Sequence, residues 1–289
     1  MVDEHKSMDD DRLETVGSFW NSHPCGKHFI QMEFGSPEWF AAFRDFRYTK
    51  EHHLNDLIDW QAARDKSLLE IGLGMGADAT RWAAEAGQYT GIDLTPEAVE
   101  TTRKHLELLG LEGEVVQGNA EALPFPDDHF DLVYSQGVLH HTPDTPAAFR
   151  EVRRVLKPGG QFMVMVYTKE SFNYWVRIQM YMRLRVLLSA GADGLGLGLG
   201  EPWASHVKNL RQMGPEYLGW SEFPHHCTDG PDCSIARTYT TKSLNRLLEE
   251  TGFRVERMEK AHLPLGLSNQ GLERLLASYL GFYLYAWAR

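Results

Sequence analysis

The sequence predicts a single doubly wound α/β domain, mostly parallel, with one antiparallel strand at the end and a helical lid. Two observations support this fold class. Short apolar runs alternate with helical patterns between residues 67 and 167, as in parallel sheets whose strands are joined by helices. The first apolar run leads into Gly72, Gly74 and Gly76, and a helical pattern begins directly afterwards. This is typical of a strand–turn–helix whose backbone must lie close to a ligand.

Seven strands are expected, and the first five alternate with three helices. The second helix is the best marked, because Thr95 can cap it, Pro96 suits its first position and Gly110 can end it. Near the C-terminus, helical patterns cover residues 241–250 and 272–280. The strands are expected at 67–72, 88–93, 113–117, 130–135, 161–167, 253–261 and 281–289, and the core helices at 78–87, 95–109 and 145–156.

Two segments lie outside this alternation. Residues 1–17 are polar and are expected to fray, whereas the aromatic-rich remainder of 1–60 predicts an N-terminal helical cap. Such a cap either closes the mouth of a binding site or only buries the sheet edge. Residues 169–238 hold a helical run, a Gly-Leu tract and a turn-rich loop, and predict a lid. The expected segments are cap 1–60, core 61–168, lid 169–238 and closing elements 239–289.

The composition limits the partners and the compartment. A net charge of −11 disfavours duplex nucleic acid as a substrate, because phosphate binding requires a basic face. Three scattered cysteines do not suggest a disulfide framework. The acidic N-terminus shows no signal peptide, and no apolar run is long enough to span a bilayer. These observations favour the cytoplasm and leave homo-oligomer formation open.

The glycine turn and Asp93 indicate an adenosine-containing cofactor. Asp93 closes the second strand, where a carboxylate can accept hydrogen bonds from ribose hydroxyls. Gly72, Gly74 and Ala77 also fit the dinucleotide pattern G-x-G-x-x-G/A, so a nicotinamide cofactor is an alternative. Glu70 argues against it, because a carboxylate facing the loop repels a diphosphate and attracts a sulfonium or ammonium group.

Three further motifs follow in order along the chain. They are Asn119-Ala120-Glu121-x-Leu123-Pro124-Phe125, Ser135-Gln136-Gly137-Val138-Leu139-His140-His141 and Leu156-Lys157-Pro158-Gly159-Gly160. Together with Glu70-x-Gly72-x-Gly74-x-Gly76 and Asp93, they resemble the ordered motifs of class I S-adenosylmethionine-dependent methyltransferases. The resemblance covers residues 66–168. It implies a Rossmann-like seven-stranded sheet with an antiparallel last strand, and S-adenosylmethionine as the cofactor.

The resemblance also implies which residues hold that cofactor. The loop glycines approach the methionine portion, and Glu70 supports the loop and the cofactor's charged end. Leu94 packs on the adenine, while Asn119, at a position where the family commonly has Asp, and Ala120 hydrogen-bond to it. A structural role explains Gln136 equally well. The expected cofactor-binding residues are Glu70, Gly72, Gly74, Gly76, Asp93, Leu94, Asn119, Ala120, Ser135 and Gln136.

Four residues are candidates for the chemistry. His140 and His141 follow the fourth strand, where an imidazole can take a proton from a hydroxyl or an acidic carbon. A capping or packing role is the favoured alternative for this pair. Tyr167 and Glu170 lie just past the fifth strand, and Glu170 is a candidate base. Lys169 beside them is a candidate anchor for an anionic substrate, with simple solvent exposure as the alternative.

The lid adds candidate substrate-binding residues. Arg177, Tyr181, Arg185 and Leu188 lie at helical spacing and share one face. Arginines among aromatics can hold an anionic group on an apolar body, which makes Arg177 and Tyr181 candidates together with Lys169. An ordinary amphipathic helix is the favoured interpretation. No metal is expected, because the spacing in the nearby loop fits no established zinc pattern; that loop holds His225, His226, Cys227, Asp229 and Cys233.

The predicted function is transfer of a methyl group from S-adenosylmethionine to oxygen or carbon of a small molecule. Aromatic residues in the cap and the lid indicate a partly apolar acceptor, and the arginines leave an anionic one open. The alternatives are a methyltransferase acting on a macromolecule and a cofactor-binding protein without its own turnover. A nicotinamide-dependent oxidoreductase is the least favoured.

Overall fold

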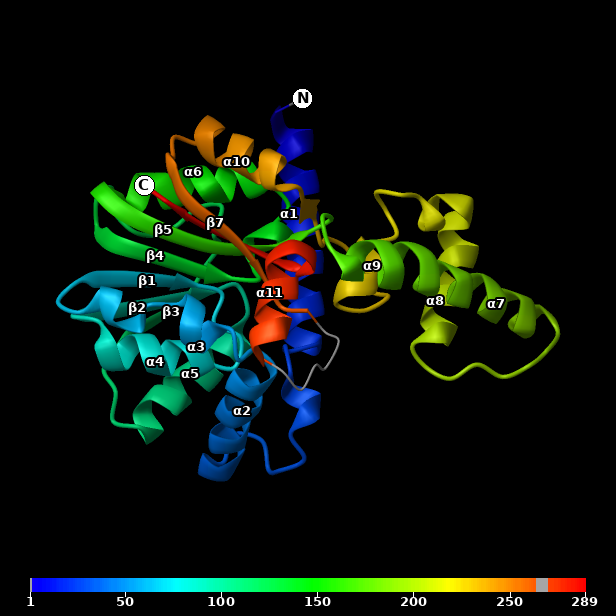
Figure 1. Cartoon of the computed structure of the whole chain (residues 1–289), viewed down its shortest axis with the longest axis horizontal. Helices are drawn as coiled ribbons and strands as arrows, with labels where there is room; N and C mark the ends of the chain where they lie inside the picture. The colour runs from blue at the N-terminus through cyan, green and yellow to red at the C-terminus, as the bar shows by residue number, and fades with distance from the viewer. Residues whose placement is uncertain (1, 264–269) are drawn as a thin grey trace. The chain divides into compact units, whose positions relative to one another are not determined.

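The computed structural model describes residues 2–263 and 270–289, which contain one sheet in the order β3-β2-β1-β4-β5-β8-β7, with β6 paired to β5 (Figure 1). β1, β2, β3, β4 and β5 pair in parallel along this order. The strands are β1 (Ser67–Ile71), β2 (Gln88–Asp93), β3 (Glu114–Gln117), β4 (Phe130–Gln136), β5 (Leu156–Thr168), β6 (Thr238–Tyr239), β7 (Val255–Ala261) and β8 (Tyr283–Ala288).

β8 is the antiparallel strand. Backbone hydrogen bonds join Arg254 to Arg289 near one end of the β7–β8 pair, and Phe282 to His262 near the other. The residue numbers run in opposite directions, so β8 opposes β7. The predicted seven-stranded, mostly parallel sheet with an antiparallel last strand is confirmed, and the two-residue β6 adds to it.

β5 differs from its predicted range. It begins at Leu156, which pairs with Phe130, and not at residue 161. The ladder changes register before Gln161 pairs with Leu132, so the Pro-Gly-Gly segment is a bulge inside the strand. Gly159 has a φ of 79°, which glycine adopts without strain. The strand therefore begins five residues before its predicted start, because pairing to β4 is present on both sides of the bulge.

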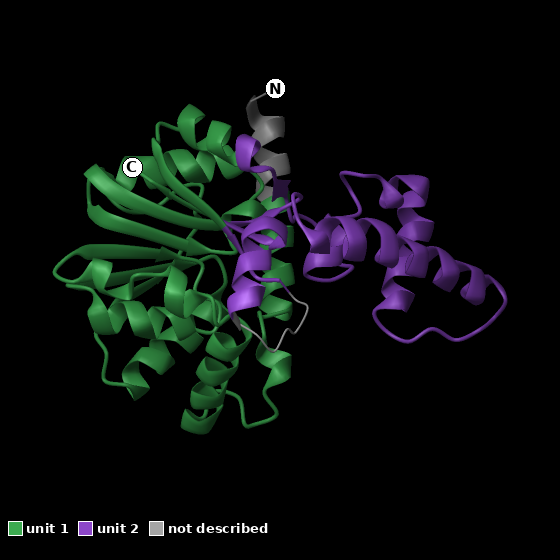
Figure 2. Ribbon diagram, viewed as in Figure 1, with its two compact units in different colours: residues 1–165, 244–259, 285–289 green, residues 166–243, 260–284 purple. Residues whose placement is uncertain are grey.

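The structure divides into two compact units (Figure 2). Unit 1 comprises residues 1–165, 244–259 and 285–289, and unit 2 comprises residues 166–243 and 260–284. β5, β7 and β8 each continue from one unit into the other. The four segments expected from the sequence stay a prediction.

Helices cover both faces of the sheet in unit 1. α4 (Ala77–Glu85) and α5 (Pro96–Leu108) lie on one face, and α6 (Thr145–Val155) and α10 (Thr241–Glu250) on the other (Figure 1). The Thr95 hydroxyl accepts from the Ala98 N–H at 3.4 Å, which confirms the predicted cap of α5. Leu69, Val133 and Phe149 are fully buried between sheet and helices.

Unit 1 also contains the N-terminal helices. The expectation that residues 1–17 fray is wrong over 2–17, because α1 begins at Val2. Val16 and Phe19, three residues apart, are buried and hold its second half on the core. The elements are α1 (Val2–Ser22), η1 (Lys27–Phe29), α2 (Pro37–Lys50), α3 (Leu54–Leu57) and η2 (Trp60–Ala63).

Unit 2 is largely helical. The predicted helical run is present, with its first part a π-helix, η4 (Asn173–Met182), that continues directly into α7 (Arg183–Gly194). The other helices described here are α8 (Trp203–Met213), η5 (Gly214–Leu218), α9 (His225–Thr228) and α11 (Gln270–Leu280). Over the described ranges of both units, no helix combines the length and apolar character that a bilayer crossing requires.

Candidate cofactor and active site

The loop from β1 to α4 lies where the strand order reverses, between β1 and β4. Gly72, Gly74 and Gly76 have φ values of 84°, 53° and 74°, a region that favours glycine. A Cβ added at Gly72 would lie 2.1 Å from a methyl of Val138, so a side chain does not fit there. A Cβ added at Gly74 would meet no described atom within 4 Å, so the turn is open at that point. This geometry suits a ligand that contacts backbone.

Asp93 joins this loop to the end of β2. Its carboxylate accepts from the Leu73 N–H at 2.8 Å and from the Thr95 N–H and hydroxyl at 2.8 and 2.9 Å. A carboxylate has about four acceptor positions, so one remains for a ribose hydroxyl. The residue thus fits the predicted role and also fixes the loop. Leu94 lies under α1, since a Cβ added at Gly17 would be 3.5 Å from its side chain.

The loop after β3 lies beside the end of β2. The Gly118 N–H donates to the Asp93 carbonyl at 2.9 Å, and the Gln117 amide donates to the Leu94 carbonyl at 3.1 Å. Asn119 accepts from the Glu121 N–H at 2.9 Å, which leaves its amide N–H groups and one lone pair for an adenine. The residues expected to hold adenosine therefore come from adjoining loops. These donors and acceptors fit S-adenosylmethionine.

Ser135 and Gln136 have structural partners at the end of β4. Ser135 is fully buried and donates to the Ile71 carbonyl at 3.1 Å, which ties β4 to β1. The Gln136 amide donates to the Tyr285 hydroxyl at 2.8 Å. Their contact with the methionine part of the cofactor stays a prediction.

Glu70 is a buried carboxyl beside the glycine loop. It accepts from the Tyr89 hydroxyl at 2.7 Å and is 2% exposed. Burial raises the pKa of Glu70 well above its usual range, and the charge of Asp78 adds to this effect. The hydrogen bond from Tyr89 opposes the rise without cancelling it. A cation placed beside this carboxyl would favour its ionised form.

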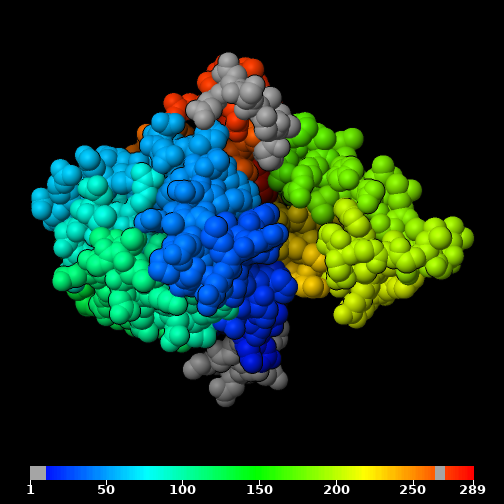
Figure 3. Space-filling view, turned by 90° about the horizontal axis from the view of Figure 1, so that it is seen from below, coloured from blue at the N-terminus to red at the C-terminus, as the bar shows by residue number. Residues whose placement is uncertain are grey.

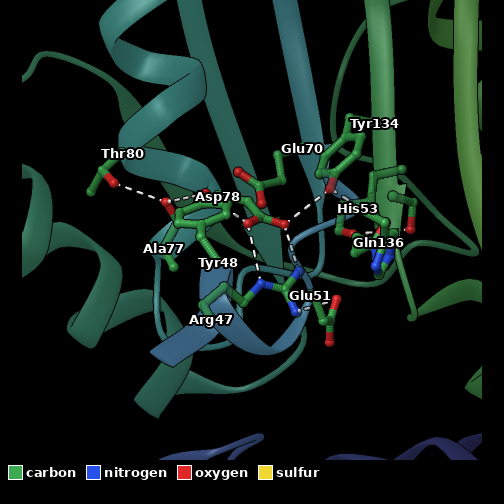
Figure 4. Close-up of polar contacts among 12 residues, drawn as sticks. Arg47, Tyr48, Glu51, His53, Glu70, Ala77, Asp78, Thr80, Tyr134 and Gln136 are labelled. Atoms are coloured by element: carbon green, nitrogen blue, oxygen red, sulfur yellow. Dashed lines mark hydrogen bonds and ion pairs between the residues drawn. The ribbon is translucent and has the colours of Figure 1, made fainter. Parts of the chain in front are cut away.

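A second buried carboxylate, Asp78, organises a larger polar cluster (Figure 4). Arg47 of α2 donates to both of its oxygens, at 3.3 Å from Nε and 2.7 Å from Nη2. Hydroxyls of Tyr48 and Tyr134 donate to it at 3.0 and 2.9 Å. Burial pulls the pKa of Asp78 up, but the charge and hydrogen bonds of Arg47 outweigh it and lower the pKa. Asp78 is therefore ionised, in the first turn of α4.

The cluster extends across the sheet to β8. The Tyr134 hydroxyl lies 3.4 Å from Gln136 Oε1, and Tyr285, which receives the Gln136 amide, lies 3.0 Å from His53 Nε2. We call this set the Asp78 network: Arg47, Tyr48, His53, Asp78, Tyr134, Gln136 and Tyr285. Apart from Gln136, none of these residues was predicted from the sequence. A carboxylate two residues after Gly76, in a helical first turn, is the one local signal.

The predicted catalytic histidines lie in η3 (Leu139–His141), directly after β4. His140 and His141 are 0% and 3% exposed. The His141 ring contacts Trp20 of α1 edge-on, with centroids 4.9 Å apart. Packing under α1 is consistent with the favoured alternative, and a proton-transfer role stays a prediction.

The other predicted residues lie in unit 2. Glu170 accepts from the Thr241 N–H and hydroxyl at 3.2 and 2.7 Å, and it pairs with Lys260 at 3.3 Å. Burial raises its pKa, but these contacts outweigh burial and lower it, which makes the carboxylate a weaker base. Glu170 thus holds the start of α10, and its role as a base stays a prediction.

Tyr167 donates to Asp229 at 3.0 Å, and its ring stacks on Phe282 at 4.6 Å. The Lys169 backbone N–H donates to the Tyr239 carbonyl at 3.0 Å. Arg177 and Tyr181 lie on the exposed face of η4, and Tyr181 is 53% exposed. Catalysis by Tyr167 and substrate binding by the other three residues stay predictions.

Comparisons with known proteins show which proteins the core of this chain resembles. Residues 69–164 match a family of methyltransferase domains. The ubiquinone/menaquinone biosynthesis C-methyltransferase of Shewanella woodyi is 34% identical over 130 residues, which are 43% of this chain and 52% of that protein. The chain spans about half the length of the curated relatives it matches.

Solved structures share the fold over most of the chain. An S-adenosylmethionine-dependent methyltransferase from Aquifex aeolicus superposes with a TM-score of 0.51 and 15% identity, covering 88% of this chain and 97% of that one. The [4+2]-cyclase SpnF gives a TM-score of 0.52 and 18% identity, covering 95% and 94%. Because one of these neighbours is named for a cyclisation, the fold by itself does not determine the reaction.

Proposed function

Because the chain belongs to the class I S-adenosylmethionine-dependent methyltransferases, we propose that it transfers a methyl group from S-adenosylmethionine to a small, partly apolar acceptor, at oxygen or carbon. The arrangement of the loops after β1, β2 and β3 carries the proposal. Gly74 leaves the first loop open, Asp93 keeps an acceptor position, and Asn119 keeps donors. When bound, the cofactor supplies a methyl group on a positively charged sulfur.

The chain's own residues position the reactants and exclude water. Asp93 holds the ribose while it fixes the Leu73 N–H, so the loop and the ribose site are set by one carboxylate. The buried carboxyl of Glu70 ionises more readily when a cation lies beside it, so the loop favours a cation over an anion. α1 brings Trp20 onto His141, an apolar cover at the end of β4. Alignment in a dry site suits methyl transfer, which needs little acid–base chemistry.

The finer features of the proposal are the acceptor, the residue that takes its proton and the compartment. The aromatic cover supports a partly apolar acceptor, and the curated relative is named a C-methyltransferase of quinone biosynthesis. His141 is our candidate for taking a proton from the acceptor, because it follows β4 beside that cover. The cytoplasm remains the predicted compartment, in keeping with cysteines that are few and scattered along the chain.

Transfer of a labelled methyl group tests the proposal. Purified protein is incubated with methyl-labelled S-adenosylmethionine and cell extract, and the label is partitioned into organic-soluble, aqueous small-molecule and precipitable fractions. We expect label in a small-molecule fraction. Label confined to the precipitate would favour a macromolecular acceptor. Binding of S-adenosylhomocysteine without any transfer would favour a binding role.

A variant pair links the assay to the site. Asp93→Ala removes the hydrogen bond between a charged group and the ribose, which contributes about 1.5–3 kcal/mol, so S-adenosylhomocysteine should bind about 10- to 150-fold more weakly. Asp45→Ala, at an exposed position of α2, is the matched control and should bind normally. Unchanged affinity in Asp93→Ala would overturn the assignment of the cofactor site.

A further inference from the structure

We propose that the outer face of η4 and α7, with the Gly-Leu tract that follows, docks on an anionic lipid membrane. Nine of the twenty exposed large apolar side chains among the described residues lie between positions 175 and 197. Figure 3 shows this part of the chain at the surface in green to yellow-green. Met180, Leu188 and Leu195 are 66%, 61% and 81% exposed. We call this surface the docking face. So dense a set of exposed apolar side chains marks an interaction site.

The exposed face belongs to an ordered helix. Ile178, Met182 and Val186 lie on its opposite side and are 0%, 7% and 0% exposed. Their spacing of four residues keeps one side of the helix in the core of unit 2, so the apolar residues on the other side are held outward.

The charge of the segment fits an anionic surface. Residues 171–192 contain three arginines and no acidic residue, in a chain whose net charge is −11. Arg177 and Arg185 are exposed and form no ion pair with any carboxylate that the structure describes. The flanking acidic residues are already paired, Glu170 with Lys260 and Asp193 with Arg211. The positive charge of the docking face is therefore not neutralised within the protein.

The whole of unit 2 shares this bias. It carries ten Lys and Arg against eight Asp and Glu, a net charge of +2, so the acidity of the chain lies in unit 1. Arginines beside Leu, Trp and Tyr, on a helix that does not span the bilayer, are typical of segments that lie in the membrane interface.

A second copy of the chain fits the docking face less well. In a two-fold dimer the same surface meets itself, so Arg177 and Arg185 would face their own counterparts. Lipid headgroups with negative charge would neutralise them instead, and Trp175 and Tyr181, 51% and 53% exposed, suit the headgroup level. The inference does not depend on methyl transfer, because it is tested by binding alone.

Vesicle co-sedimentation of the full chain tests the inference. We expect binding to vesicles of phosphatidylglycerol mixed with phosphatidylcholine, weaker binding to phosphatidylcholine alone, and a decrease with added salt. The double variant Leu184→Glu and Leu188→Glu should lower the partition coefficient at least tenfold. Arg177→Gln should lower it about fivefold, the usual effect of one basic residue near the surface.

The control introduces the same charge elsewhere. Leu108 and Leu109 are 44% and 41% exposed in unit 1, and the double change of both to Glu should leave vesicle binding intact. Circular dichroism and S-adenosylhomocysteine binding report whether each variant is folded. Absence of binding to the anionic vesicles, or an equal loss in the control, would overturn the inference. The inference would also be overturned if the protein did not bind vesicles but formed a concentration-dependent dimer that Leu184→Glu dissociates.

Discussion

Replacing Glu70 by Gln tests whether the carboxyl beside the glycine loop is protonated in the folded protein. The side chain is 2% exposed, and its one hydrogen-bond partner among the described residues is the Tyr89 hydroxyl. Burial and the charge of Asp78 raise the pKa of Glu70 well above the ordinary value of 4.5. Gln has the same shape and still accepts from Tyr89, but it does not titrate.

The sign of the effect follows from proton binding. Between pH 4.5 and the raised pKa of Glu70, the folded state holds a proton that the unfolded chain has released. The free energy of unfolding therefore falls as the pH rises, by about 1.4 kcal/mol per pH unit. The stabilisation is complete below pH 4.5 and is lost as the pH passes through the folded-state pKa.

Urea unfolding of the wild type and Glu70→Gln, at half-unit steps from pH 5 to pH 8, measures this difference. The stability of the wild type relative to the variant should fall with the stated slope, and the pH at which it levels off gives the folded-state pKa of Glu70. Glu107→Gln, at an exposed position of α5, is the control for the loss of a carboxyl elsewhere in the chain. A difference between the wild type and Glu70→Gln that stays constant over this range would refute a protonated buried carboxyl.

Three further changes probe the site. Arg47→Met leaves the buried Asp78 carboxylate without its ion-pair partner and should lower the free energy of unfolding by about 3–5 kcal/mol in urea titrations; a loss below about 1 kcal/mol would contradict the pairing. Tyr285→Phe removes a hydroxyl of the Asp78 network and should cost about 1–3 kcal/mol in the same assay, so an unchanged midpoint would count against that contact. Gly74→Ala strains a residue with a φ of 53° by about 1–2 kcal/mol and fills the open turn. Calorimetry should therefore show weaker binding of S-adenosylhomocysteine, and wild-type affinity would place the ligand elsewhere.

The sheet and its core helices could be predicted because their signals are local. Thr95 and Pro96 mark the start of α5 within two residues, and the structure shows the same cap. The bulge in β5 could not be predicted, because Pro158 and Gly159 favour a turn when only the local sequence is considered. Pairing of Leu156 with Phe130 on the neighbouring strand decides the outcome.

The polar interior of the site could not be predicted from the sequence either, because it depends on contacts between distant parts of the chain. Arg47, Asp78, Tyr134 and Tyr285 come from α2, α4, β4 and β8 and meet through tertiary packing alone. Gly91 contributes to the hydrogen bond of Glu70 without contacting Glu70 through a side chain of its own. A Cβ there would lie 2.7 Å from the Tyr89 hydroxyl, so the absence of a side chain on β2 makes room for the group that reaches Glu70.

The position of β8 has a consequence for how the chain is made. It leaves the ribosome after every other strand of the sheet, yet it lies between β5 and β7. Until β8 is synthesised, the edge of β5 that it covers lacks this partner, and the Gln136 amide lacks the Tyr285 hydroxyl as its acceptor. A product that stops before β8 therefore lacks both a closed sheet and a finished Asp78 network. Translation must therefore run through residue 288 before the sheet and the Asp78 network are complete, and a chain that ends earlier exposes a strand edge that can pair with another chain.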